Sequence, residues 1–290
     1  MRDFILMTDS CCDLPAQLAD DLEVEVLPLS LIMGGNTYRN YLDGREISFS
    51  DFYNRIRTEQ HSTTSAVSVG EFEDAMRAIL KDGKDILYIG FSSPLSTTYQ
   101  SACIAADGLR EEFPEATILT VDSQCASMGQ GLLVYQCGLQ RQKGHSIQEV
   151  YEFAEQTKGS ICHWITVEDL FHLKRGGRVS GATALFGTML SIKPILHVDD
   201  EGHLLAVSKC RGRKASLLAL VDAMEKTATN PTEQTVFISH GDCEDDAQFV
   251  ADEIKRRFGT KDIRINFAGP VVGNHTGAGM LALFFMGTPR

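Results

Sequence analysis

The 290-residue chain lacks several features that mark large classes of protein. No apolar run approaches the roughly 20 residues that a membrane-spanning helix needs. The chain does not open with a basic segment and an apolar core, as a signal peptide would. Basic residues are in the minority, since 27 Lys and Arg against 39 Asp and Glu give a net charge of −12, which disfavours nucleic acids and anionic membranes as partners. We therefore expect a cytoplasmic protein without nucleic-acid binding or stable membrane insertion.

Closely spaced cysteine pairs of the C-x-x-C type are absent as well. Cys11 and Cys12 are adjacent, and the other six cysteines are scattered along the chain. Disulfide bonds are not expected in a chain of this size without an export signal. Zinc sites usually show paired, closely spaced ligands. We therefore predict free thiols, most of them buried, and neither a metal nor a cofactor.

Common catalytic motifs are missing too. No serine lies in a G-x-S-x-G pattern, and no glycine-rich stretch matches G-x-x-x-x-G-K-[ST] or G-x-G-x-x-G. His240 and His275 still leave open a hydrolase or a phosphoryl-transfer enzyme as an alternative function. His275 lies between Gly273 and Gly277, where the backbone could approach a ligand closely. An ordinary histidine in a turn is the competing interpretation.

The pattern of apolar segments indicates an α/β protein in two parts. In residues 1–160, strand-like and amphipathic helical segments alternate, which predicts an N-terminal Rossmann-like domain with a parallel sheet. In residues 161–290, strands at 195–198 and 203–207 flank an Asp-Glu-Gly turn and predict a hairpin. We therefore expect a C-terminal α/β domain with a mixed sheet.

Several local assignments follow from the same patterns. Residues 24–31 are predicted as one strand kinked at Pro28, and residues 34–44 as a loop. Residues 184–190 and 280–285 are predicted as helices, and residues 269–279 as a glycine-rich loop.

Hydroxyl side chains gather where the predicted strands of the first half end. The serine-rich stretch 92–98 follows an apolar run and precedes a helical pattern that begins at Tyr99. Free N–H groups and the positive end of a helix suit a carboxylate or a phosphate, and ligands bind at this edge of parallel sheets. The competing interpretation is that Ser93 or Ser96 only caps the helix. The side chains expected to rim a cleft are Ser10, Thr64, Ser96 and Ser123.

A basic cluster at residues 209–214 stands out within the acidic chain and contains Arg211 and Arg213. It is either a solvated corner between a strand and a helix or a patch that docks an acidic partner or a phosphate. Arg178, which follows Gly176 and Gly177, leaves the same two interpretations open.

Several motifs, in this order and at this spacing, resemble the DegV family of bacterial fatty-acid-binding proteins, some of which carry the lipid for a fatty acid kinase. The resemblance extends over nearly the whole chain. The motifs are Met7-Thr8-Asp9-Ser10 with Asp13-Leu14-Pro15, Thr64-Ser65, Ser92-Ser93-x-Leu95-Ser96, Val121-Asp122-Ser123, Leu173-x-x-Gly176-Gly177-Arg178, Lys193-Pro194 and Gly269-Pro270-Val271-Val272-Gly273-x-His275-Thr276-Gly277.

The resemblance implies a lipid-binding protein that is not itself an enzyme. Two α/β domains would enclose a long-chain fatty acid, and a partner kinase would phosphorylate the carboxylate. Thr64 and Ser96 would bind the carboxylate near His275, and Arg211, with Arg213 beside it, would face the kinase. The remaining head-group candidates are Ser65, Ser93 and Thr276. The acyl chain would lie in an apolar tunnel of the second domain, with core packing as the alternative for each candidate: Leu185, Phe186, Met189, Leu190, Ile192, Phe267, Leu281 and Phe284.

The sequence departs from the family pattern at a few positions around this site. Ala66 and Val67 stand where Gln-Pro is usual, Ala278 stands where proline is common, and Thr97 stands in a glycine position. A β-branched residue disfavours positive φ. We therefore expect the loop that carries Ser96 to have a different shape here.

Overall fold

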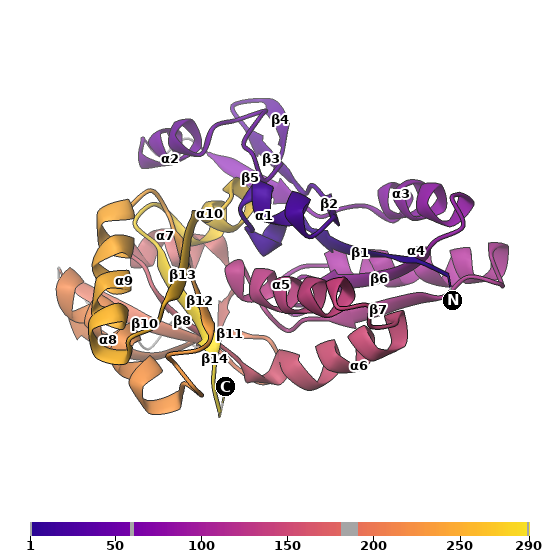
Figure 1. The fold of residues 1–290 in the computed structure, drawn as a ribbon. Coiled ribbons are helices and arrows are strands. Elements are labelled where there is room, and N and C mark those ends of the chain that lie inside the picture. The colour runs from indigo at the N-terminus through magenta and orange to yellow at the C-terminus, as the bar shows by residue number, and fades with distance from the viewer. Residues whose placement is uncertain (1, 59–60, 181–190, 289) are drawn as a thin grey trace.

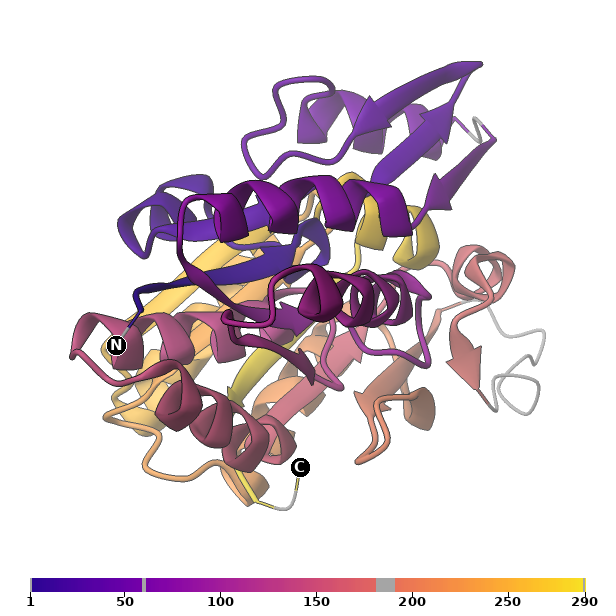
Figure 2. The same ribbon diagram turned by 90° about the vertical axis from the view of Figure 1, so that its right-hand side faces the viewer.

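A computed structural model describes residues 2–58, 61–180, 191–288 and 290 of the chain. The predicted helix at 184–190 lies outside these residues, as do four of the tunnel candidates, Leu185, Phe186, Met189 and Leu190. The described strands form three sheets, one parallel, one mixed and one antiparallel (Figures 1 and 2). The predicted α/β class, with a parallel sheet followed by a mixed sheet, is confirmed.

The parallel sheet lies in the first half of the chain. Its strands, in spatial order, are β2 (Val24–Leu27), β1 (Phe4–Asp9), β6 (Asp85–Gly90) and β7 (Ile118–Asp122). Every residue of β6 is buried, because helices cover both faces of such a sheet. The serine-rich stretch therefore begins at the carboxyl end of a central strand.

The helices around this sheet are η1 (Ser10–Cys12), α1 (Ala16–Asp21), α3 (Val69–Lys81), α4 (Thr98–Glu112), α5 (Met128–Gln142), α6 (Ile147–Thr157) and η2 (Lys158–Ser160). Ser68 and Glu71 form a capping box that begins α3, and Ser146 and Glu149 begin α6 in the same way. α5 packs against strands of both large sheets and is buried along most of its length. It therefore joins the two halves.

The mixed sheet contains all the described strands from residue 161 onward. In spatial order they are β13 (Asp262–Phe267), β12 (Thr235–His240), β14 (Leu281–Met286), β8 (Ile161–Thr166), β10 (Ile192–Val198), β11 (Leu204–Arg211) and β9 (Val179–Ser180). The predicted hairpin is present as the antiparallel pair β10 and β11. Helices α8 (Arg213–Thr227) and α9 (Glu244–Phe258) pack on one face of the sheet, and α5 packs on the other.

A small antiparallel sheet was not predicted. It consists of β4 (Asn36–Arg39), β3 (Ser30–Met33) and β5 (Ser62–Ser65), and together with α2 (Phe49–Arg57) it forms a lobe at the top of Figure 1. The single strand predicted over 24–31 is wrong, because the chain passes from one sheet to another at Pro28, which lacks an N–H donor. The loop predicted over 34–44 is wrong only at residues 36–39, which form β4, because Gly34 and Gly35 adopt positive φ and close a hairpin.

Two assignments near the end of the chain need correction. Residues 280–285 were predicted as a helix, but β14 lies between β12 and β8. A run of six apolar residues shows neither the helical nor the strand periodicity of hydrophobic residues. A central strand that is buried on both faces has such a run because all of its side chains are apolar. The glycine-rich stretch 269–279 contains a helix, α10 (Pro270–Thr276), which begins at a proline in the tolerated first turn. α10 packs against α7 (Leu170–Gly176).

Candidate functional site

A cavity of about 660 Å³, here called cavity 1, lies between the serine-rich stretch, β5 and α10. The six predicted head-group residues all line it: Thr64, Ser65, Ser93, Ser96, His275 and Thr276. The fold thus gathers hydroxyls from two sheets and an imidazole from the end of the chain at one place.

Ser10 and Ser123, which were also expected at the rim, are not exposed there. Both side chains are buried. The Ser10 hydroxyl accepts a hydrogen bond from the N–H of Leu29 at 3.0 Å, and the Ser123 hydroxyl accepts one from the N–H of Cys125 at 3.1 Å. These serines hold loops in place and do not rim the cavity.

Thr64 and His275 form the polar centre of the cavity wall. Thr64 Oγ1 lies 2.9 Å from His275 Nε2, and His275 Nδ1 lies 3.0 Å from the carbonyl oxygen of Gly176. A carbonyl only accepts, so the ring carries its proton on Nδ1 and Nε2 accepts from Thr64. Burial, with a further contribution from Arg178, lowers the pKa of His275 to about 4. The imidazole is therefore neutral near pH 7.

Local structure explains how these two side chains meet. Thr64 pairs with Leu31 in the small sheet, and the alternation along β5 leaves Thr64 half-buried between exposed neighbours. α7 and α10 touch through their backbones, because a β-carbon on Gly176 would lie within 3.0 Å of the His275 carbonyl oxygen. Gly177 then takes a φ of +69° and ends α7 just before Arg178.

Ser96 fits both roles considered for it, as a residue that caps the following helix and as a residue of the binding site. Its hydroxyl accepts a hydrogen bond from the N–H of Thr98 at 3.3 Å and lies 2.9 Å from the Thr98 hydroxyl, while the side chain also lines cavity 1. Thr97 has φ −77° and ψ 1°, a conformation open to any residue. The threonine in the glycine position therefore causes no backbone strain. It gives no steric reason for the loop that carries Ser96 to differ in shape.

Two buried carboxylates hold the loops that surround the cavity. Asp9 accepts hydrogen bonds from the Tyr88 hydroxyl at 2.8 Å and from the Phe91 N–H at 2.9 Å, at the start of the serine-rich stretch. Asp13 accepts from the Gly269 N–H at 2.9 Å, directly before α10. Burial raises the pKa of both carboxyl groups, that of Asp13 to about 7. Their motifs were visible in the sequence, but their positioning role was not.

The apolar lining of cavity 1 comes from both halves of the chain. It consists of Cys11, Leu29, Ala66, Phe91, Pro94, Leu95, Ala126, Val179, Leu204, Val271 and Val272. Among the described tunnel candidates, Leu281 and Phe284 are buried core residues and Phe267 packs beside the small lobe. Neither these nor Ile192 belong to the lining. Core packing therefore holds for Leu281 and Phe284. Ile192 and Phe267 are half-buried and lie outside the lining of cavity 1.

A second cavity of about 620 Å³, cavity 2, lies on the other side of the same wall. Thr64, Arg178 and His275 line both cavities. Cavity 2 is rich in basic side chains, and no aspartate or glutamate appears among its described lining residues, which are Ile56, His61, Ser62, Thr63, Thr64, His172, Arg175, Gly176, Arg178, Asn274 and His275. The sequence had singled out Arg178, three residues after Arg175, as a possible phosphate contact, but the histidines and hydroxyls that complete this cavity come from separate segments.

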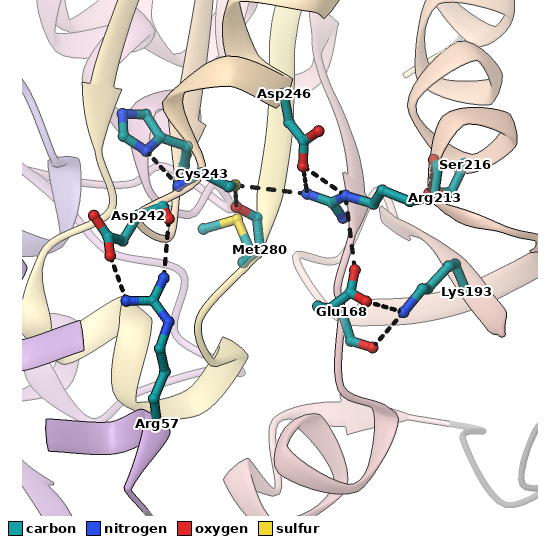
Figure 3. Close-up of polar contacts among 10 residues, drawn as sticks. Arg57, Glu168, Lys193, Arg213, Ser216, Asp242, Cys243, Asp246 and Met280 are labelled. Carbon is teal, nitrogen blue, oxygen red and sulfur yellow. Dashed lines mark hydrogen bonds and ion pairs between the residues drawn. The ribbon is translucent and has the colours of Figure 1, made fainter. Parts of the chain in front are cut away.

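The basic corner at 209–214 contains two different arginines. Arg213 donates to Asp246 at 2.8 Å and approaches Glu168, which in turn pairs with Lys193 (Figure 3). Arg211 is exposed at the end of β11 and has no ion pair within the described part of the chain. Of the two residues predicted to dock a partner, Arg211 is free to do so and Arg213 already has partners.

His240, the other candidate base, lies away from this wall. Its Nδ1 accepts a hydrogen bond from the Cys243 N–H at 3.2 Å, and its ring packs against that of Phe267. It lines neither cavity 1 nor cavity 2.

The fold and the site define an α/β protein whose two halves enclose a partly apolar cavity with hydroxyls and an imidazole in its wall. The family model of the DegV proteins, described as uncharacterised, matches residues 3–288, and the chain belongs to this family. A DegV domain-containing protein of Clostridium perfringens is 44% identical over 290 residues, which cover 100% of this chain and 99% of the relative.

Solved structures agree with this assignment. A DegV family protein of Thermus thermophilus, described as fatty-acid-binding, is 30% identical and superposes with a TM-score of 0.87 over 98% of this chain and 99% of its own. A fatty-acid-binding DegV protein of Streptococcus agalactiae is 27% identical, with a TM-score of 0.85 over 100% of both chains. No helix in the described ranges has the length and apolar character to cross a membrane.

Proposed function

We propose that this protein binds a long-chain fatty acid in cavity 1. The observation that carries the proposal is the composition of that cavity, in which Thr64, Ser96 and His275 lie beside an apolar lining. The carboxylate would bind at the hydroxyls, supported by Ser65, Ser93 and Thr276. Residues 1–160 would supply most head-group loops, and residues 161–290 would supply the imidazole and part of the apolar wall.

The energetics of such a ligand favour this division of the cavity. Each hydrogen bond to an ionised carboxylate contributes about 1.5–3 kcal/mol in net terms. Each buried methylene group contributes about 0.8 kcal/mol. The acyl chain would therefore supply most of the affinity, and the polar wall would fix the position of the head group.

We further propose that the bound carboxylate is presented to a partner kinase. Arg211 is exposed and available for docking, whereas Arg213 would stabilise the basic corner at 209–214 through its ion pair with Asp246. Cavity 2 gives additional support, because Arg175 and Arg178 line it without a neighbouring carboxylate among the described lining residues. A phosphoryl group that approached the head group would meet positive charge there.

Mass spectrometry of an organic extract of the purified protein tests the binding proposal. We expect fatty acids in about equal amount to the protein, or saturable binding of added fatty acid after the extraction. A protein that carries no lipid and binds no added fatty acid would refute the proposal.

A further inference from the structure

Gly176, His275 and Thr64 form a chain of hydrogen bonds that begins at a carbonyl. The Gly176 oxygen can only accept, so it fixes the proton of the neutral imidazole on Nδ1. Nε2 then accepts the hydroxyl proton of Thr64. In this state the Thr64 oxygen offers only lone pairs toward cavity 1.

An ionised carboxylate is also only an acceptor. A chain that runs from the Gly176 carbonyl through His275 and Thr64 to a carboxylate oxygen joins two acceptors through three hydrogen bonds, and each bond needs a proton. The neutral imidazole supplies one proton and the Thr64 hydroxyl supplies another. One proton is missing.

We propose that a fatty acid head group enters cavity 1 together with one proton from solvent, which it shares with the Thr64–His275 pair. With this proton on the ring, His275 donates to Thr64 and Thr64 donates to the carboxylate. With the proton on the ligand, the carboxyl group donates to Thr64 and Thr64 donates to His275. Both arrangements satisfy every hydrogen bond with the same number of protons. The inference rests on the proposed function, since the carboxyl group must reach Thr64.

The surroundings explain why the free protein does not already hold this proton. Burial, Arg178 and His172 all lower the pKa of His275. Tyr53, which packs against α10 at Gly273, stays neutral because burial raises the pKa of its hydroxyl. No carboxylate lines either cavity within the described residues. The titratable and charged side chains that line the two cavities around the pair are Cys11, His61, His172, Arg175, Arg178 and His203. A negative charge therefore reaches His275 only with the ligand.

Isothermal titration calorimetry with decanoate tests the inference directly. At pH 6.5 the free decanoate is ionised and the imidazole is neutral, so any proton in the complex must come from the buffer. We expect the binding enthalpy to differ between phosphate and Bis-Tris buffers by an amount that corresponds to about one proton per ligand. Saturable binding without this buffer dependence would overturn the inference and leave the proposed function intact. Absence of decanoate binding would overturn the inference, whereas the proposed function depends on long-chain fatty acids and is tested separately by the organic extraction.

Three variants locate the proton. In His275→Gln the side-chain amide can donate to Thr64, which frees the hydroxyl to donate to the carboxylate, so we expect uptake near zero. In Thr64→Val the imidazole faces the carboxylate directly. Nε2 of the neutral ring and the carboxylate are both acceptors, so a proton is still needed between them and proton uptake should stay near one per ligand. His145→Gln is the matched control, since His145 is exposed just before α6 and lines neither cavity, so its proton uptake should equal that of the wild type. Uptake of a full proton by His275→Gln would refute the assignment.

Discussion

Gly176 in the last turn of α7 and His275 in α10 are in backbone contact. The contact is so close that a β-carbon on Gly176 would clash with the carbonyl oxygen of His275. This contact sets the distance at which the Gly176 oxygen accepts from His275 Nδ1. The position of the imidazole in the cavity wall therefore depends on a glycine that lies 99 residues away in the sequence.

Gly176→Ala should lower the free energy of unfolding and weaken fatty acid binding together. The added methyl group must push α10 away, and such overpacking typically costs about 1–3 kcal/mol. Urea denaturation measures the first effect and a fatty acid titration the second. Gly108→Ala in the interior of α4 is the matched control, since a β-carbon there meets no atom within 4 Å and should stabilise the helix by roughly 0.5–1 kcal/mol. Equal effects of the two substitutions would contradict this account.

The double variant Thr64→Val and Ser96→Ala should bind fatty acid about 100-fold more weakly than the wild type. If the proposed binding mode holds, each substitution removes one hydrogen bond to the carboxylate, and roughly 1.4 kcal/mol corresponds to a factor of ten. Thr63→Val is the control, because Thr63 is exposed on the opposite side of β5 and does not line cavity 1. An unchanged dissociation constant in the double variant would show that the head group binds elsewhere.

Sequence reasoning brought together the six residues that line cavity 1 because each belongs to a short motif at the end of a strand or in a glycine-rich segment. Thr64 and His275 are 211 residues apart, and only the resemblance to the DegV family led us to expect them at one site. The sequence could not show which hydrogen-bond partner sets the tautomer of His275. That depends on the approach of α7 to α10, which is a tertiary contact with no local signature.

The errors have physical causes of the same kind. β14 consists of six apolar residues without a period, so only its place between two strands distinguishes it from a helix. The small lobe depends on the register of β3 with β4 and β5, which is a pairing between distant segments. The apolar wall of cavity 1 was predicted in the second half alone, because burial in a core and exposure to a cavity give the same apolar pattern.

Arg211→Ala should leave the stability and the lipid affinity of the protein nearly unchanged and prevent co-purification of the proposed kinase. Arg211 is exposed, and substitutions at such positions usually change stability by less than about 0.5 kcal/mol. Arg213→Ala should instead reduce stability by about 1 kcal/mol, because it leaves Asp246 without its guanidinium partner. Thermal unfolding and pull-down assays on both variants separate the two roles. Kinase binding that survives Arg211→Ala would contradict the docking proposal.

The buried carboxyl group of Asp13 should make the protein less stable as the pH rises from about 5 to 8. Burial raises the pKa of Asp13 from 3.8 to about 7 in the folded state, so the folded protein holds a proton that the unfolded chain has lost. Stability from this group is therefore present at low pH and is lost as the pH passes through 7. In Asp13→Asn the amide tolerates the φ of 49° and can keep the hydrogen bond from Gly269, so the midpoint of urea unfolding should fall less between pH 5 and pH 8. Some slope should remain, because the pKa of Asp9 is also raised. Identical pH profiles for the variant and the wild type would show that Asp13 does not change its ionisation on folding.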